Sequence, residues 1–161
     1  MKNHEFFVKK WESEQPAFGR VLRAVPAGKL DYRPHERSTA AGDLAWQIAQ
    51  EQRQLCDLLD KGEIHHEHTA HPGDPAKIAD AYDKATNDLR TRLEKLDEKA
   101  CEKPAKFFFH GKEAWTDTVG NMLWGYLFDM VHHRGQLSAY LRPMGGKVPA
   151  IYGPSADDMG S

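Results

Sequence analysis

The segment LWGYLFDMVHHRGQLSAYL, residues 123–141, combines an apolar helical pattern with polar groups beside its buried side. Successive residues of a helix turn by about 100°, and with Met130 as reference the leucines and tyrosines of the segment fall within about 80° of it. His133 lies about 60° to one side of Met130, and Asp129 lies about 100° to the same side. His132 points outward. We therefore expect a long helix that carries His133 and Asp129, one turn apart, at the edge of the core.

The rest of the chain repeats this helical pattern. Four segments show the spacing of amphipathic helices, at about residues 5–25, 41–59, 74–100 and 116–141. Pro16 lies inside the first segment and should kink or split that helix. Ser38 or Thr39 is placed to cap the second helix. Asp74 followed by Pro75 is typical of a helix start and opens the third. Because such stripes are buried only against one another, the pattern predicts an all-α four-helix bundle.

Two segments lie outside the predicted helices. KPAKFFFHGKEAW, residues 103–115, holds adjacent aromatics and a glycine, which favours a short extended stretch or a hairpin before the last helix. GGKVPAIYGPSADD, residues 145–158, follows the last helix and should be an extended tail that packs back on the bundle, over the site or over a dimer surface. With 161 residues, the chain is expected to form a single domain over residues 1–161.

Composition excludes several classes of protein. A net charge of -2 gives no reason to expect nucleic acid as a partner, since phosphate-binding domains carry a basic excess. No apolar run approaches the roughly 18 residues that a membrane-spanning helix needs, so we expect no membrane partner. The first residues are charged where a secretory signal would be apolar, and two cysteines are too few for a disulfide framework. A cytoplasmic location is therefore expected.

The second predicted helix also carries a polar pair beside its apolar stripe. With Ile48 as reference, Glu51 lies about 60° away and Gln47 about 100° away on the same side. Burial of a carboxylate or an imidazole without a partner costs several kcal/mol, so these groups need a shared partner. A divalent metal held between the second and fourth helices would satisfy all of them. The alternative is a hydrogen-bonded core network in which His133 bonds Asp129 or Glu51 and no metal binds.

Arg134 lies about 40° from Met130, toward the interior, where an unpaired guanidinium would be costly. We expect it to pair with a carboxylate and to play a structural role. The candidate partners are Asp43, Glu51 and Asp157.

A histidine-rich segment and three aromatic residues each allow a functional and a structural interpretation. The run GEIHHEHTAHP, residues 62–72, holds four histidines from His65 to His71, which would either capture zinc or nickel from outside or belong to a flexible solvated loop. Trp46, Tyr126 and Tyr140 would line a pocket beside the metal, or they are plain core residues.

Two stretches carry a resemblance to a known family. HHRGQLSAYLRPMGGKVPAIYGPSAD at 132–157 and LDYRPHERSTAAGDLAWQIAQE at 30–51 resemble the DinB-like (DinB/YfiT) superfamily of metal-dependent four-helix bundles. The resemblance covers nearly the whole chain, and its most specific part is HRGQ at the close of a long helix. Members bind a divalent metal through three histidines. His133 matches the last of these, whereas Asp129 and Gln47 stand where the other two histidines are usual.

This departure from the family pattern allows two interpretations. In the first, Asp129, Gln47 and Glu51 supply oxygens beside the His133 nitrogen, and the metal is manganese, iron, nickel or zinc, with zinc held less tightly. In the second, the metal is lost and the bundle is a degenerate binding scaffold.

The resemblance also implies an activity. Characterised relatives include thiol-dependent S-transferases and an isomerase, which implies a thiol transferase or hydrolase that acts on a small-molecule substrate with a low-molecular-weight thiol. The metal would lower the pKa of a water or a thiol. The alternative is a non-catalytic, stress-related binding or dimerisation module. Members are often dimers, so a homodimer is implied.

Overall fold

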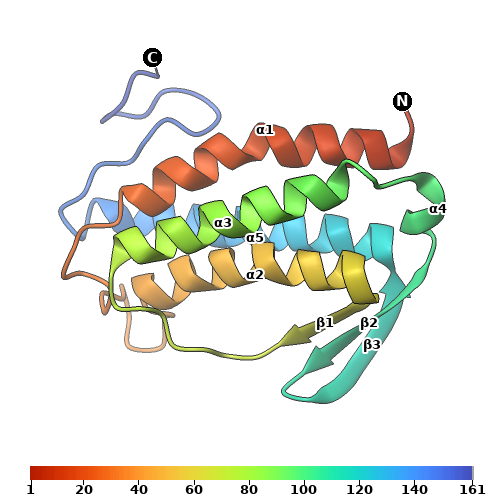
Figure 1. Cartoon of the computed structure of the whole chain (residues 1–161). Helices are drawn as coiled ribbons and strands as arrows, with labels where there is room; N and C mark the ends of the chain where they lie inside the picture. The colour runs from red at the N-terminus through yellow and green to blue at the C-terminus, as the bar shows by residue number, and fades with distance from the viewer. Residues whose placement is uncertain (161) are drawn as a thin grey trace.

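The computed structural model describes residues 1–160, which form four long helices, one short helix and a small sheet (Figure 1). The elements are α1 (Asn3–Arg23), α2 (Ala41–Lys61), β1 (Glu63–His66), α3 (Pro75–Leu93), α4 (Glu98–Cys101), β2 (Pro104–Phe109), β3 (Lys112–Thr118) and α5 (Val119–Leu141). The prediction of an all-α four-helix bundle is confirmed only in part: the chain is mainly helical, but three segments pair as strands. Among residues 1–160, no helix has the length and apolarity needed to cross a membrane.

The sheet lies beside one end of the long helices and has the order β1-β2-β3 (Figure 1). β2 and β3 are antiparallel and form the hairpin that the aromatic run allowed. His110 and Gly111 connect them with φ values of 48° and 75°, as a two-residue hairpin turn requires, and glycine meets this requirement without a steric penalty. β1 pairs in parallel with β2 and buries Ile64 completely. The loop expected at residues 62–72 therefore begins with a strand.

Helix α2 begins where the sequence predicted, but its cap is different. Ala40 stands at the N-cap, so neither Ser38 nor Thr39 caps the helix. Backbone carbonyls of the preceding loop replace a side-chain cap, because Tyr32 O accepts from the Ala41 amide at 2.8 Å and Leu30 O from the next amide at 2.7 Å.

The other long helices agree with the prediction in part. α1 runs unbroken through Pro16, so the predicted split does not occur. Asp74 caps α3 as expected and accepts from the Ala76 amide at 2.9 Å. α3 ends at Leu93 and not near residue 100, since Asp97 caps the separate short helix α4. α5 begins at Val119 because the residues before it belong to β3.

Arg134 is buried on the side of α5 that faces α1. Its Nη1 donates to Glu14 Oε2 at 2.7 Å, and its Nη2 donates to the Tyr152 hydroxyl at 2.6 Å. The guanidinium also lies over the Phe18 ring, 4.5 Å from its centroid. All three predicted partners are therefore wrong, although the structural role is supported by this pairing: Arg134 joins α5 to α1 and to the tail.

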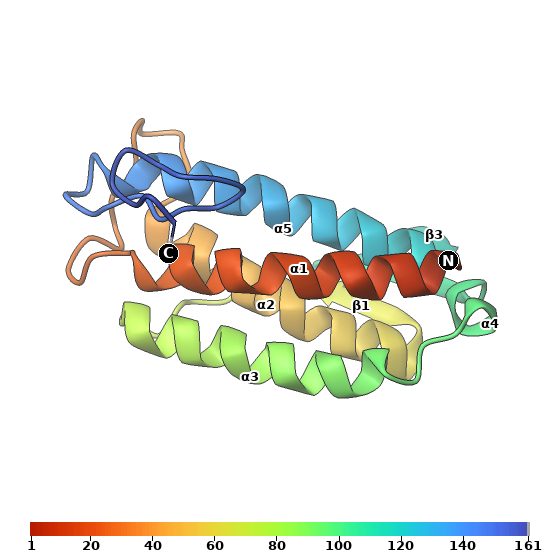
Figure 2. The same ribbon diagram turned by 90° about the horizontal axis from the view of Figure 1, so that it is seen from above.

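The C-terminal tail is extended and packs back on the bundle, as the sequence indicated. Figure 2 shows it over α1 and the end of α5. Val148 and Ile151 contact the core, and Arg20 Nε donates to the Ala150 carbonyl at 3.0 Å. Asp157, one of the residues proposed for Arg134, accepts instead from Arg142 at 2.8 Å.

The Glu14 carboxylate should be worth far more to stability than its exposed neighbour. Glu14→Ala leaves the Arg134 guanidinium, which is 2% exposed, without its anion and should cost about 3 kcal/mol of the free energy of unfolding. Glu12 pairs with Arg90 at the surface, and Glu12→Ala should cost less than about 1 kcal/mol. Urea unfolding followed by circular dichroism measures both, and equal losses would contradict a structural role for the buried pair.

Candidate metal centre

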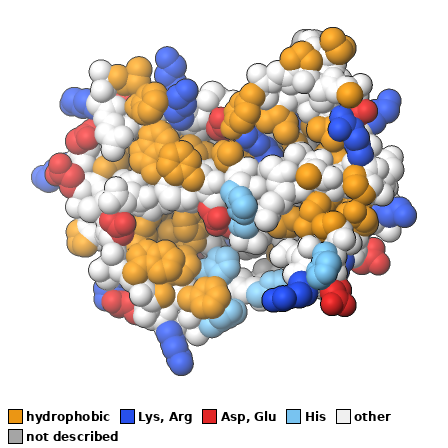
Figure 3. All heavy atoms as spheres, turned by 180° about the vertical axis from the view of Figure 1, so that it is seen from behind, with side chains coloured by type: hydrophobic (Ala, Val, Ile, Leu, Met, Phe, Trp, Pro, Cys, Tyr) orange, Lys and Arg blue, Asp and Glu red, His pale blue; other side chains and the backbone are white. Residues whose placement is uncertain are grey.

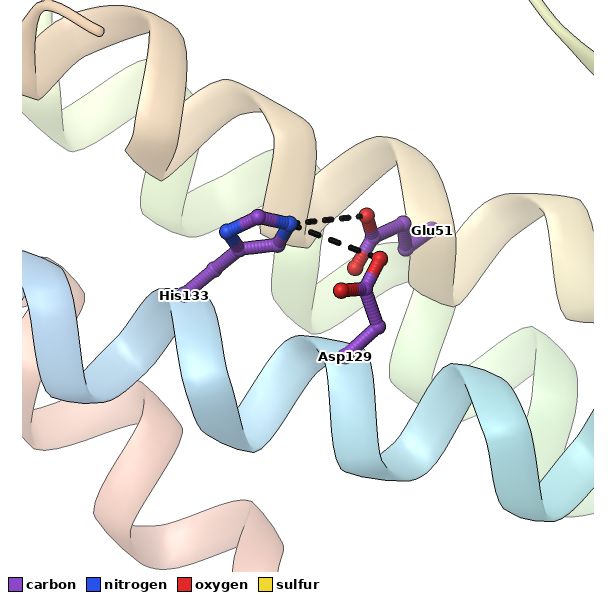
Figure 4. A group of neighbouring side chains, drawn as sticks. All are labelled: Glu51, Asp129 and His133. Atoms are coloured by element: carbon purple, nitrogen blue, oxygen red, sulfur yellow. Dashed lines mark ion pairs between the residues drawn. The ribbon is translucent and has the colours of Figure 1, made fainter. Parts of the chain in front are cut away.

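Helices α2 and α5 lie side by side and bring three potential ligands together (Figure 4). Glu51 comes from α2, and Asp129 and His133 come from successive turns of α5. One ligand atom from each lies within 4.8 Å of the others. His133 Nε2 is 3.6 Å from Glu51 Oε1 and 3.4 Å from Asp129 Oδ2. The helical angles thus placed three of the four predicted ligands in one cluster.

The three side chains differ in their exposure to solvent. The Glu51 side chain is 2% exposed, the His133 side chain 14% and the Asp129 side chain 53%. Within the described chain, Glu51 Oε2 is a buried side-chain oxygen that has no hydrogen-bond donor. Leaving such an atom without a partner costs about 1–3 kcal/mol, so this position calls for a group that the protein itself does not provide.

Gln47, the fourth predicted ligand, holds two of these residues in place. Its Nε2 donates to Glu51 Oε1 at 2.8 Å and lies 2.8 Å from His133 Nε2. Gln136 lies on the other side of the imidazole, with its Oε1 3.0 Å from His133 Nδ1. The Nδ1 proton is therefore directed to Gln136, and Nε2 faces the carboxylates, which is the orientation that a metal-ligating histidine needs.

Burial and neighbouring charges displace the pKa values of all three groups. Burial first, and then the charge of Asp129, raise the pKa of Glu51 to about 8. The hydrogen bond from His133 lowers the pKa of Asp129. Burial alone would lower the pKa of His133, but its bonds to Asp129 and Gln136 and the charge of Glu51 raise it to about 9. Without metal, these shifts favour the protonated forms of Glu51 and His133 and the charged form of Asp129.

Two clefts meet at this cluster. One, which we term the aromatic cleft, has a volume of about 730 Å³ and is lined by Gln47, Glu51, His66, Phe107, Phe109, Trp115, Asp117, Asn121, Met122, Gly125, Tyr126, Phe128, Asp129 and His132. The other, the polar cleft, has about 380 Å³ and is lined by Arg33, Glu36, Arg37, Ser38, Thr39, Ala40, Asp43, Trp46, Gln47, Gln50, Glu51, Gln54, His66, Glu67, His68 and Thr69. Figure 3 shows histidine and acidic side chains between hydrophobic patches on the far face of the molecule.

The three aromatic residues expected at the pocket are placed differently. Trp46 lines the polar cleft and donates from Nε1 to the Thr69 hydroxyl at 2.9 Å. Tyr126 lines the aromatic cleft. Tyr140 lines neither cleft, and its ring packs edge-on against Tyr32 with 5.7 Å between centroids.

His66 and Gln136 belong to the site, yet sequence reasoning did not single them out. The sequence favours a loop at His66, but this residue lies on β1 and lines both clefts. Burial lowers its pKa. The only local sign of this strand was the short run EIHH, which is too brief to show a period. Gln136 was visible as the last residue of HRGQ, and its spacing of three from His133 is the signal that could have marked it.

Comparison with known proteins agrees with this fold. A family model described as the DinB family matches residues 1–160. The uncharacterised protein YrdA of Bacillus subtilis (strain 168) is 24% identical over 169 residues, covering 96% of this chain and 90% of YrdA. A DinB-like protein from Bacillus cereus has a TM-score of 0.77 and 21% identity, covering 92% of this chain and 97% of its own. A DinB-like protein from Bacillus subtilis has a TM-score of 0.67 and 18% identity, and the match covers 88% of this chain and 92% of that protein.

The raised pKa values predict how pH changes the stability of the metal-free protein. Glu51 and His133 bind a proton more tightly in the folded than in the unfolded chain, so stability is lost as the pH rises. The stability that Glu51 contributes is lost as the pH rises from 4.5 to about 8. The contribution of His133 is lost as the pH rises from 6.5 to about 9. The free energy of unfolding should fall by on the order of 3–5 kcal/mol between about pH 5 and pH 8, as measured by urea unfolding with a chelator present.

Glu51→Gln provides the control, because the amide is uncharged at every pH and has nearly the same shape. The variant should lose much less stability over the same pH range. A slope equal to that of the wild type would show that Glu51 keeps an ordinary pKa in the folded chain.

Proposed function

This chain belongs to the DinB family, and we propose that its Glu51, Asp129 and His133 hold a divalent metal ion between α2 and α5. The single observation that carries this proposal is Glu51 Oε2, a buried oxygen without a donor that lies beside an imidazole nitrogen and a second carboxylate. A cation would replace the missing donor and offset the charge that burial makes costly.

The donor set and its spacing suit such an ion. Ligand atoms around a metal with bonds of about 2.1 Å lie roughly 3.0–3.5 Å apart, close to the 3.4 Å and 3.6 Å measured from His133 Nε2. Two carboxylates and one imidazole suit manganese, iron(II), nickel or zinc. Gln47 would supply a fourth donor if its amide turned its oxygen toward the cluster, where its nitrogen now contacts Glu51 and His133.

The proposed activity is that of an enzyme that joins a thiol or a water to a small electrophile. The bound metal supplies Lewis-acid chemistry, which lowers the pKa of a thiol or a water. Asp129 is the only half-exposed member of the cluster, so reactants would approach on its side. Gln136 keeps the His133 ring oriented, and Glu51 closes the site from the core.

The two clefts favour a reaction with two reactants, and hence a transferase over a hydrolase. Both clefts reach Gln47 and Glu51, so compounds bound in each would meet at the cluster. Arg33 and Arg37 line the polar cleft, and neither forms an ion pair within residues 1–160. They would suit the carboxylates of a low-molecular-weight thiol, although Glu36, Asp43 and Glu67 line the same cleft and restrict such contacts to its arginine side.

One observation favours a second candidate, a non-catalytic binding module. Gln47 already bonds Glu51 Oε1 and contacts His133, so hydrogen bonds within the protein serve the cluster except at Glu51 Oε2. In that case the protein would take up no metal at this site.

Metal content distinguishes the two candidates. Untagged protein that is loaded with manganese, nickel or zinc and then gel-filtered should retain about one ion per chain by elemental analysis. His133→Ala and Glu51→Gln should retain almost none, because each removes a ligand of the proposed site.

His68→Ala is the matched control, since this histidine lines the polar cleft but lies outside the cluster. It should keep the wild-type metal content. Metal that disappears only with His68 would assign binding to the histidine-rich segment, and wild-type protein without metal would favour the binding module.

A further inference from the structure

The aromatic cleft exposes rings that a folded chain normally hides. Trp115 is 51% exposed, Phe109 49% and Phe128 64%. Trp115 lies opposite Phe107 in the hairpin register, and the two rings stack with 3.8 Å between centroids and 13° between planes. Exposed rings gathered around one cleft are the usual mark of a binding site.

The inner end of the cleft is polar and belongs to the cluster described above. Glu51 and Asp129 line it, and Glu51 is 1% exposed with its Oε2 unpaired. The Tyr126 hydroxyl is already used, because it donates to Gln54 Oε1 at 3.0 Å. Tyr126 therefore offers the cleft only its ring, and Glu51 and Asp129 supply the polar groups at its inner end.

The charged side chains that line the aromatic cleft, other than histidines, are all acidic. The lining includes the carboxyl groups of Glu51, Asp117 and Asp129 but no lysine or arginine. A metal at the cluster would offset Glu51 and Asp129, yet it would leave Asp117 negative. Aromatic ring faces also attract cations and repel anions. An anionic compound is therefore disfavoured here, where no arginine or lysine lines the cleft.

We propose that the aromatic cleft binds a flat aromatic compound, uncharged or positively charged, and is the subsite for the electrophile. The ring system would stack in the cleft beside Trp115 and Phe128, with its reactive carbon toward Asp129. A volume of about 730 Å³ accepts two fused rings and a short substituent. The role as electrophile rests on the proposed function, whereas binding of the ring does not.

Three probes that share one ring system test this proposal: 2-naphthylmethanol, 2-naphthylmethylamine in its ammonium form, and 2-naphthoate. Each is titrated into metal-free protein by calorimetry. The alcohol and the ammonium should bind, and the anion should bind at least about tenfold more weakly, because only the anion opposes the acidic lining.

Two variants from different elements locate the binding. Trp115→Ala on β3 and Phe128→Ala on α5 should each weaken binding of the alcohol about tenfold through lost stacking. Phe6→Ala removes an exposed ring outside the cleft and should leave binding unchanged. Phe128 lies on a helix surface, so its variant keeps the test valid if the hairpin variant fails to fold.

Several results would overturn the proposal. These are naphthoate binding as tightly as the ammonium, binding that both cleft variants leave unchanged, or a dimer in sedimentation experiments that Trp115→Ala dissociates. The last result would mean that a second copy of the chain covers the rings. Metal retention, measured on protein loaded with metal as described above, separates the two hypotheses: ring binding without metal retention removes the proposed enzyme alone, and metal retention without ring binding removes this inference alone.

Discussion

A carboxyl group buried between two helices is the constraint around which this site is organised. Glu51 lies in the packed interior, where an isolated carboxylate would cost several kcal/mol. The chain responds in three ways: burial shifts the pKa of the acid upward, Gln47 donates to one oxygen, and His133 brings a positive charge close to it. The second oxygen stays without a donor. This unpaired oxygen is the reason why we propose a cation at the cluster.

Helix α5 serves two partners through neighbouring residues. His133 faces α2 and the cluster, while Arg134 faces α1, because adjacent side chains on a helix differ in direction by about 100°. Arg134 and Glu14 tie α1 and the tail to α5. Gln136, one turn from His133, orients the imidazole. Three residues of the run HRGQ thus have separate roles. His133 belongs to the cluster, Arg134 holds α1, and Gln136 accepts from the imidazole of His133.

The small sheet gives the cluster its surroundings. Long helices alone would place Glu51, Asp129 and His133 together, but the aromatic cleft beside them needs β1 and the hairpin as a second wall. His66 enters from β1, and Phe107 and Trp115 enter from the hairpin. Rings held on a paired hairpin lose little further freedom when a ligand stacks on them, which favours binding of a rigid compound.

The sequence by itself determined what depends on local periodicity. The angles around Met130 and Ile48 placed Asp129, His133, Glu51 and Gln47 at the core edge, because a helix repeats at a constant angle whatever it packs against. The sequence also predicted the hairpin and the cap at Asp74, since the residue preferences of turns and caps act over a few residues.

Only the tertiary structure decided contacts between residues far apart in the chain. Arg134 and Glu14 are separated by 120 residues, and no local pattern favours Glu14 over Asp43, Glu51 or Asp157. β1 became a strand because β2 pairs with it, so His66 reached the site through a partner that its own four-residue segment does not specify. Tyr140 shares the apolar stripe of α5 but packs on Tyr32, because position along the helix, and not direction alone, sets the neighbour of a side chain.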